Sequence, residues 1–261
     1  MTPGRPATVA AVVLACCLTT PSFAQDQSNE FARSKRYAKC MELARGDPDI
    51  GHKAAQAWRA DGGGIGARHC TAVALLGLGH YEQAAQMLQT LADGTAARSF
   101  GLRLELLSQA ANAWLIAGKP ATAYIVQTAA LAARPNDIEL LIDRSISLAS
   151  TAKYWEAIDD LNRALDIDPG RVEALIFRAS AYRRLDTLEL AEVDITRALA
   201  IAPHHPEALL ERGNIRRLKG DHEGARRDWL RVIEAGSATP EAAAARLNLE
   251  RLDVKPNTNG P

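Results

Sequence analysis

The sequence predicts an all-α fold, an α-solenoid of helical hairpins that ends in a capping helix, and three observations support this prediction. The stretch 172–205 contains two amphipathic helical patterns separated by a short polar turn. Prolines recur in a 34-residue register at Pro135, Pro169 and Pro203, and a fixed period of this length is typical of stacked helical repeats. Hydrophobic residues make up 47% of the chain and aromatic residues only 5%, which favours helices rich in Ala and Leu over a β-sandwich.

These patterns divide the chain into consecutive units. In order, we expect a signal peptide (1–24), a degenerate N-terminal helical hairpin (25–64), five repeat units (65–98, 104–137, 138–171, 172–205 and 206–239), a capping helix (240–254) and a disordered tail (255–261).

The first segment has the three parts of a signal peptide. Arg5 provides a positive charge, Ala7–Leu18 an apolar run, and Ser22-Phe23-Ala24 a small-x-small cleavage site. The apolar run is shorter than the roughly 20 residues that a membrane-spanning helix needs. We therefore expect cleavage before Gln25 and a periplasmic protein without an integral membrane segment. The alternative is a lipoprotein anchored at Cys16, because Val13-Leu14-Ala15-Cys16 resembles a lipoprotein box.

Cleavage at this site leaves two cysteines, Cys40 and Cys70. An exported compartment is oxidising, so an even number of cysteines suggests one disulfide bond. Both residues are expected on leading helices of successive units, and such helices pack side by side. The alternative is a pair of buried thiols in the helix core.

In the N-terminal hairpin, a polar lead-in is expected to give way to a helix at about Phe31. Asp47 and Pro48 predict the start of a second helix, as N-cap and first helical residue. Asp61-Gly62-Gly63-Gly64 ends this helix and predicts a linker.

The later units share one pattern. In the unit 172–205, small residues stand at the eighth and twentieth positions, Ala179 and Ala191. Residues 99–103 interrupt the register and are expected to extend the following helix backwards. Pro240 opens the last helix, whose Ala and Leu residues would cover the apolar face of the final unit.

This combination resembles the tetratricopeptide repeat, a helix–turn–helix unit of 34 residues whose close helix crossing requires small residues at those two positions. The resemblance covers about residues 65–252. It implies a concave groove lined by the first helix of each unit, mainly at positions 2, 5, 9, 12 and 13. The candidate partner-binding residues at these positions are Asn112, Ser180, Arg183, Arg184, Asn214 and Arg217. The family's carboxylate clamp for chaperone C-termini is not expected, because the required Lys positions are missing.

A charge pair recurs in the last three units. Arg144, Arg178 and Arg212 stand at the seventh position, and Asp160, Asp194 and Asp228 at the twenty-third. The unit 104–137 replaces both partners together, with Ala110 and Val126. We therefore expect three structural ion pairs within repeats, partly buried, since a buried lone carboxylate would be costly. The alternative is an arginine row that binds an anionic ligand.

Charge and motifs exclude several classes of function. Basic and acidic residues balance at 31 each, so nothing indicates nucleic-acid binding. A basic edge follows the last units, and we interpret it as a solvated helix face, with an anionic partner surface as the alternative. It comprises Arg183, Arg184, Arg216, Arg217, Lys219, Arg226, Arg227 and Arg231.

No motif for catalysis, cofactor binding or metal binding is present. The Gly62–Gly66 stretch follows a helix rather than a strand, and His69 beside Cys70 is interpreted as an ordinary histidine on a helix surface.

The expected function is that of a non-enzymatic protein–protein interaction module or scaffold of the bacterial cell envelope, binding a partner in the concave groove. The alternative is a receptor for a peptide or small ligand, or an accessory subunit of an envelope enzyme.

Overall fold

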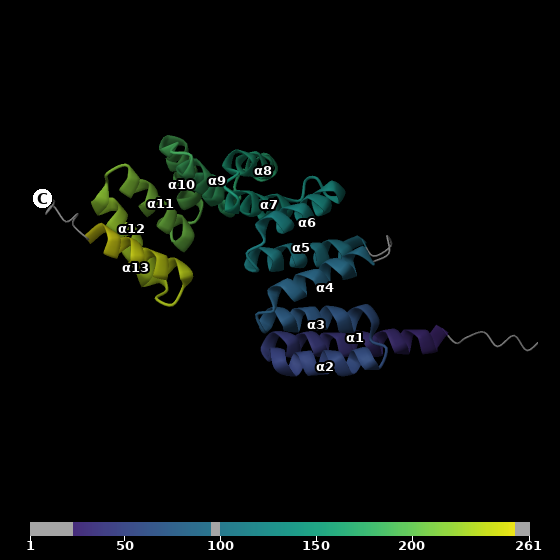
Figure 1. Ribbon diagram of the computed structural model, residues 1–261. Helices are drawn as coiled ribbons and strands as arrows, with labels where there is room; N and C mark the ends of the chain where they lie inside the picture. Colours follow the sequence, from purple (N-terminus) through teal and green to yellow (C-terminus); the bar gives the residue numbers. More distant parts are fainter. Residues whose placement is uncertain (1–22, 95–99, 254–261) are drawn as a thin grey trace, which may run out of the picture.

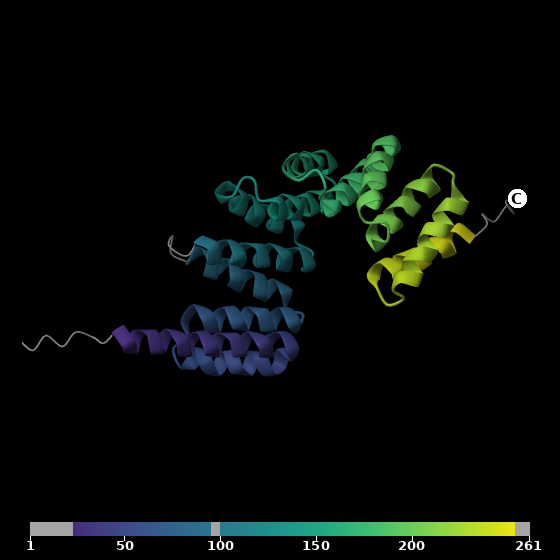
Figure 2. The same cartoon turned by 180° about the vertical axis from the view of Figure 1, so that it is seen from behind.

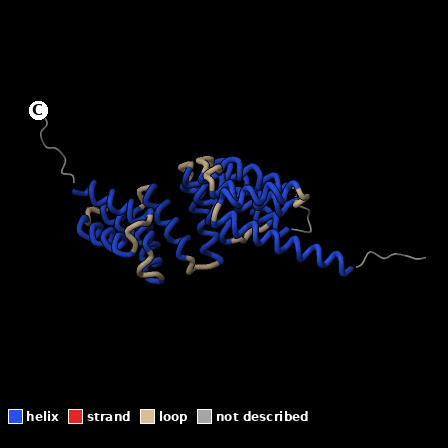
Figure 3. Tube along the Cα trace, turned by 90° about the horizontal axis from the view of Figure 1, so that it is seen from below, coloured by secondary structure: helices blue, strands red, loops and turns tan. Residues whose placement is uncertain are grey.

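The computed structural model describes residues 23–94 and 100–253. The predicted tail lies outside this part, as does the predicted signal peptide apart from its last two residues. All elements of the described part are helices (Figure 3). Their bounds are α1 Phe23–Gly46, α2 Pro48–Ala60, α3 Gly64–Gly77, α4 Tyr81–Asp93, α5 Phe100–Ile116, α6 Pro120–Ala133, α7 Ile138–Ser150, α8 Tyr154–Ile167, α9 Val172–Arg184, α10 Leu188–Ile201, α11 Pro206–Leu218, α12 His222–Ala235 and α13 Pro240–Asp253.

The helices follow one another along an open, curved stack, with α1–α3 at one end and α12 and α13 at the other (Figures 1 and 2). Consecutive helices pack against each other, and so do alternate helices such as α7 and α9 or α9 and α11. The all-α solenoid predicted from the sequence is thus confirmed. Among the helices described, none is both long and apolar enough to cross a membrane.

The core consists of small and branched residues at repeated positions. Ala179 and Ala191 are fully buried, as are Ala157 and Ala225. Because these side chains are so small, the two helices of one hairpin can approach closely. Larger residues such as Leu161 fill the space beside the crossing.

The N-terminal end of the molecule differs from its prediction in two respects. Helix α1 begins at Phe23 and includes the segment expected as a polar lead-in, because no Gly or Pro lies between Phe23 and Gly46 to interrupt a helix. As predicted, Asp47 caps α2 by accepting a hydrogen bond from the backbone N–H of Ile50 at 3.1 Å, with Pro48 at the start of the helix.

The second difference is His69, which is 1% exposed and therefore not the surface residue that we expected. Its Nδ1 lies 2.9 Å from the hydroxyl of Tyr37 on α1, and its Nε2 lies 2.9 Å from Oε1 of Gln109 on α5. The sequence interpretation was wrong because the polar partners that satisfy this ring lie 32 and 40 residues away.

Beside this histidine, Cys40 of α1 and Cys70 of α3 form the predicted disulfide. Their Cα atoms are 6.1 Å apart, and both residues are buried in a small cluster with Trp58 and Ala55. The bond joins the first and third helices directly and closes a chain segment with a sequence separation of 30.

Three Arg–Asp pairs hold the later hairpins together, in the positions where the sequence suggested them. Arg178 Nε and Nη2 donate to the two carboxylate oxygens of Asp194, each at 2.7 Å. Arg144 makes the same two-pronged contact with Asp160, and Arg212 with Asp228. The aspartate side chains are 2–5% exposed and the arginines 15–24%, so each pair is almost enclosed by protein.

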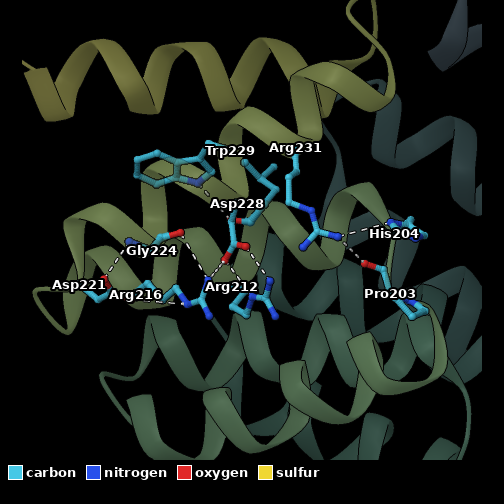
Figure 4. A network of polar contacts seen from close by, with 10 residues as sticks. Pro203, His204, Arg212, Arg216, Asp221, Gly224, Asp228, Trp229 and Arg231 are labelled. Atoms are coloured by element: carbon cyan, nitrogen blue, oxygen red, sulfur yellow. Dashed lines mark hydrogen bonds and ion pairs between the residues drawn. The ribbon is translucent and has the colours of Figure 1, made fainter.

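The last of these pairs belongs to a wider polar network (Figure 4). Asp228 also accepts a hydrogen bond from Arg216 Nη1 at 2.7 Å. The neighbouring Arg231 donates to the carbonyl of Pro203 at 3.3 Å, on the turn that precedes α11. Much of the predicted basic edge is therefore engaged within the protein.

Candidate functional site

The candidate site is a pocket between α7, α8 and α9. It has a volume of about 260 Å³ and a mainly apolar lining. The walls are Tyr154 and Phe177, and the small residues Ala149, Ser180 and Ala181 leave the space between them open. Several lining residues stand at the positions that the family resemblance assigns to the concave groove, namely Ile146, Ala149, Ser150, Ser180 and Arg184.

One charged side chain lines this pocket. Arg184, which is exposed at the C-terminal end of α9, is the only charged residue in the lining. It has no ion pair within the described residues. The pocket therefore combines an apolar cavity with one available guanidinium group, which could bind a carboxylate with two parallel hydrogen bonds.

The corresponding place in the next hairpin is closed by an ion pair. Arg183 Nε donates to Glu211 Oε1 at 2.5 Å and Nη2 donates to Glu211 Oε2 at 3.2 Å, and the glutamate side chain is 8% exposed. Asn214 donates to the same carboxylate at 3.4 Å and accepts a hydrogen bond from Asn248 at 2.9 Å. This part of the groove is thus occupied by the protein's own polar side chains.

The six predicted groove residues consequently divide into four groups. Ser180 and Arg184 line the pocket between α7, α8 and α9. Arg183 and Asn214 are held by Glu211, while Arg217 lines a second cleft near the C-terminal end. Asn112 is exposed on α5 and lines neither cavity.

The leading helices carry opposite charges at their two ends. Glutamates stand in the first turns of α7, α9, α11 and α13, and arginines in the last turns of α9, α11 and α13. This order complements the helix dipole. Burial raises the pKa of Glu207, His205 lowers it, and the carboxylates of Glu241, Glu211 and Glu173 raise it further. The acidic residues of successive repeats thus lie close enough to repel one another.

Within residues 23–94 and 100–253, no group of three His, Cys, Asp or Glu residues is arranged to hold a metal ion. The sequence analysis missed the apolar walls of the pocket, Tyr154 and Phe177, because aromatic residues at helical spacing resemble ordinary core residues. The combination that does indicate a cavity is Ala149 and Ser180, both small where the preceding unit has Leu115 and Ile146.

No protein-family model matches the sequence, and the search of curated proteins finds no match. Solved structures do match. MamA from Desulfovibrio magneticus RS-1, from residue 41 to its end, has a TM-score of 0.55 and 19% identity, covering 66% of this chain and 96% of that chain. YrrB, described as a TPR protein with an unusual peptide-binding site, has a TM-score of 0.53 and 17% identity, covering 70% and 95%. The first TPR domain of human RPAP3 is 30% identical over 45% of this chain and 91% of that chain, with a TM-score of 0.42.

Proposed function

Because the chain belongs to the tetratricopeptide-repeat family, we propose that it is a non-enzymatic protein-interaction module that binds a peptide segment of a partner protein in its concave groove. The pocket between α7, α8 and α9 carries this proposal. The pocket is open and its lining is mainly apolar. Burial of an apolar side chain of the ligand there would therefore contribute strongly to the free energy of binding.

The size of the pocket indicates what it accepts. Its volume of about 260 Å³ lies below the roughly 300–1,000 Å³ of sites for drug-sized ligands. A single large apolar side chain, such as Leu or Phe, suits this space better than a whole small molecule does. Arg184 at the rim then favours a carboxylate next to that side chain in the peptide.

The similarity to YrrB supports a peptide ligand in general terms, because YrrB is a TPR protein with an unusual peptide-binding site. A repeat stack exposes a long concave surface on which different side chains provide different specificities. The identity of the partner follows from neither the fold nor the neighbours.

The proposed location is the cell envelope of a bacterium. The pattern of residues 1–24 is that of a signal peptide, and Cys40–Cys70 is a bond that persists in oxidising compartments. N-terminal sequencing of the protein from the periplasmic fraction should begin at Gln25. Retention of Met1, or a lipid on Cys16, would contradict this location or the manner of export.

The test of peptide binding fills the pocket with the larger side chains that the protein already has at the corresponding positions one repeat earlier. Changing Ala149→Leu and Ser180→Ile reproduces the Leu115 and Ile146 of the preceding unit, so the double variant is expected to fold. Ala132→Leu, on the exposed side of α6, is the matched control for added apolar surface.

Each protein is immobilised and exposed to periplasmic extract. The wild type and Ala132→Leu should capture the same stoichiometric partner, and the pocket variant should lose it. Equal capture by the pocket variant would show that the partner binds elsewhere. A copurifying small molecule without a protein partner would instead identify a small-ligand receptor.

A further inference from the structure

A second cleft lies two repeats further along the chain, between α11, α12 and α13. Its volume is about 600 Å³, and its lining is strongly basic. The lining residues are Arg217, His222, Arg226, Asn248, Arg251 and Leu252.

This cleft is the repeat equivalent of the apolar pocket. Arg217 stands where Ala149 stands, displaced by two periods of 34 residues, and His222 replaces Tyr154 in the same way. Asn248 likewise replaces Ser180. The same site in the repeat geometry is thus open twice, once with an apolar lining and once with a cationic one.

The intervening copy of this site is the one closed by Arg183 and Glu211. In that copy the arginine at the position of Arg217 has an intramolecular carboxylate partner. In the C-terminal cleft no carboxylate is among the lining residues, and Arg217 and Arg251 have no ion pair within the described residues. The contrast identifies two guanidinium groups without an internal partner.

The rest of the local charge does not neutralise these groups. Arg226 pairs with Asp253 at the exposed end of α13, which accounts for one of the three arginines. Arg217 and Arg251 stand in the last turns of α11 and α13, where positive charge also favours the helix dipole. That effect explains a basic residue at each helix end but not their arrangement around one open cleft.

We propose that the C-terminal cleft binds acidic side chains of the same peptide whose apolar side chain enters the pocket between α7, α8 and α9. This proposal rests on the proposed function. It adds the order of residue types along the peptide: an apolar residue at one site and Asp or Glu residues two repeats away. Guanidinium groups match carboxylates geometrically, and a single carboxylate can be held by two of them.

The experiment selects peptides from a random display library long enough to span two repeats. Selection is carried out on the wild type, on Arg217→Glu/Arg251→Glu, and on Arg227→Glu. The last is the matched control, because Arg227 is exposed on α12 and does not line the cleft. Thermal unfolding checks that each variant is folded, and Arg217→Gln/Arg251→Gln replaces the charge reversal if that variant is destabilised.

We expect the wild type and the control to enrich peptides with one large apolar residue and with acidic residues at a fixed distance from it. The cleft variant should keep the preference for the apolar residue and for the carboxylate beside it that Arg184 favours, and should lose the preference for acidic residues two repeats away. A peptide selected on the wild type should bind the cleft variant about 10- to 100-fold more weakly, as expected for the loss of hydrogen bonds to a charged group. It should bind equally well with a free or an amidated C-terminus.

Each other outcome overturns a distinct part of the proposal. Wild-type peptides with an apolar residue but no acidic preference would refute the cleft assignment and leave peptide binding intact. If the preference for acidic residues two repeats away survives in the cleft variant, those residues bind somewhere other than the cleft. Loss of binding on amidation would refute side-chain carboxylates in favour of a terminal one. Absence of any enriched peptide would refute the proposed function and this inference together.

Discussion

At the scale of single residues, buried charges are the most consequential feature. The Arg144, Arg178 and Arg212 side chains each meet an aspartate on the partner helix through two hydrogen bonds. Two of the arginines also reach the preceding repeat: Arg144 Nη1 donates to Thr128 Oγ1 at 3.3 Å, and Arg178 Nη1 donates to Asn162 Oδ1 at 2.8 Å. One guanidinium group thus connects three helices, α8, α9 and α10.

Replacing Arg178 with Ala should destabilise the protein by about 3–5 kcal/mol, because it leaves the buried carboxylate of Asp194 without its partner. The double change Arg178→Met/Asp194→Leu should recover most of this loss. Arg184→Ala, at an exposed and unpaired arginine, is the control and should change stability by less than about 0.5 kcal/mol. Chemical denaturation measures the unfolding free energy of all three variants. If the double change costs as much stability as the sum of its two single changes, the pairing is contradicted.

A second residue-scale prediction concerns Asp143 on α7. Burial, together with the nearby carboxylates of Glu139 and Asp137, raises the pKa of its carboxyl group to about 6. Because the folded-state pKa exceeds the unfolded value of about 4, the folded protein binds the proton more tightly. This contribution to stability is fully present below about pH 4 and is lost as the pH rises to about 6.

Asp143→Asn should therefore stabilise the protein at pH 7 by about 1–2 kcal/mol, a value reduced from the full shift because solvent screens a partly exposed group. At pH 4 the variant and the wild type should have nearly equal unfolding free energies. Denaturation curves at the two pH values test this. A difference independent of pH would contradict the electrostatic explanation.

Single residues also show what the sequence could and could not predict. The Arg–Asp pairs were predictable because both partners recur at the same spacing and are replaced together at Ala110 and Val126. The contacts of Arg163, Arg197 and Arg231 were not, although they too recur every 34 residues, because each donates to a backbone carbonyl of a proline. Because every residue has a backbone carbonyl, the side-chain pattern does not indicate which one accepts a hydrogen bond.

At the scale of helices, the packing of α11 against α12 uses a different solution from the other repeats. Trp229 is fully buried on α12, at the place where the unit 172–205 has Ile195. A Cβ atom at Gly213 would collide with the indole ring. The glycine therefore allows α11 to accommodate the larger side chain.

Gly213→Ala should destabilise the protein by about 1–3 kcal/mol through overpacking against Trp229. Trp229→Ile alone should also destabilise it, because it leaves a cavity. The double variant restores the Ala179–Ile195 combination of the unit 172–205, and its loss of stability should be smaller than the sum of the two single losses. Chemical denaturation measures the loss of unfolding free energy in each variant. A loss in the double variant equal to the sum of the single losses would show that the contact with Trp229 is not the reason for a glycine at position 213.

The two open sites of the groove mark the limit of prediction at this scale. The helix pairs follow from periodicity and small residues, but the closure of the intervening site depends on Arg183 and Glu211, which come from different helices and are separated by 28 residues. No local pattern predicts that Arg183 turns to Glu211 while its neighbour Arg184 remains exposed. The positions expected to line the groove could thus be proposed from the sequence, but the pockets among them could not.

At the scale of the whole molecule, stability is distributed along a stack in which each hairpin depends mainly on its neighbours. Two features connect the helices at the N-terminal end. The Cys40–Cys70 bond joins α1 to α3, and His69 of α3 contacts Tyr37 of α1 and Gln109 of α5. Helices α7–α12 share no contact with that disulfide.

Cys40→Ser/Cys70→Ser should therefore weaken one end of the molecule. In the chain-entropy model, the bond contributes about 3–4 kcal/mol for a loop of this length. Hydrogen exchange should become faster in α1–α3 and remain slow in α7–α12. Uniform acceleration along the chain would contradict the repeat-by-repeat account of stability.

The stack presents a rival surface for a partner. Ile125, Trp155 and Val193 are 65%, 59% and 57% exposed on α6, α8 and α10, the second helices of their hairpins. None of the three lines the groove pocket or the basic cleft. A partner that docked on these residues would use the opposite helices from those of the groove.

The most direct test of the groove as binding site is a map of backbone amide chemical-shift changes on addition of a peptide selected on the wild type. The groove account predicts the largest changes at Ile146, Ser150 and Phe177, with a second group near Arg217 and Arg251. Largest changes around Ile125, Trp155 and Val193, with unchanged groove amides, would contradict it.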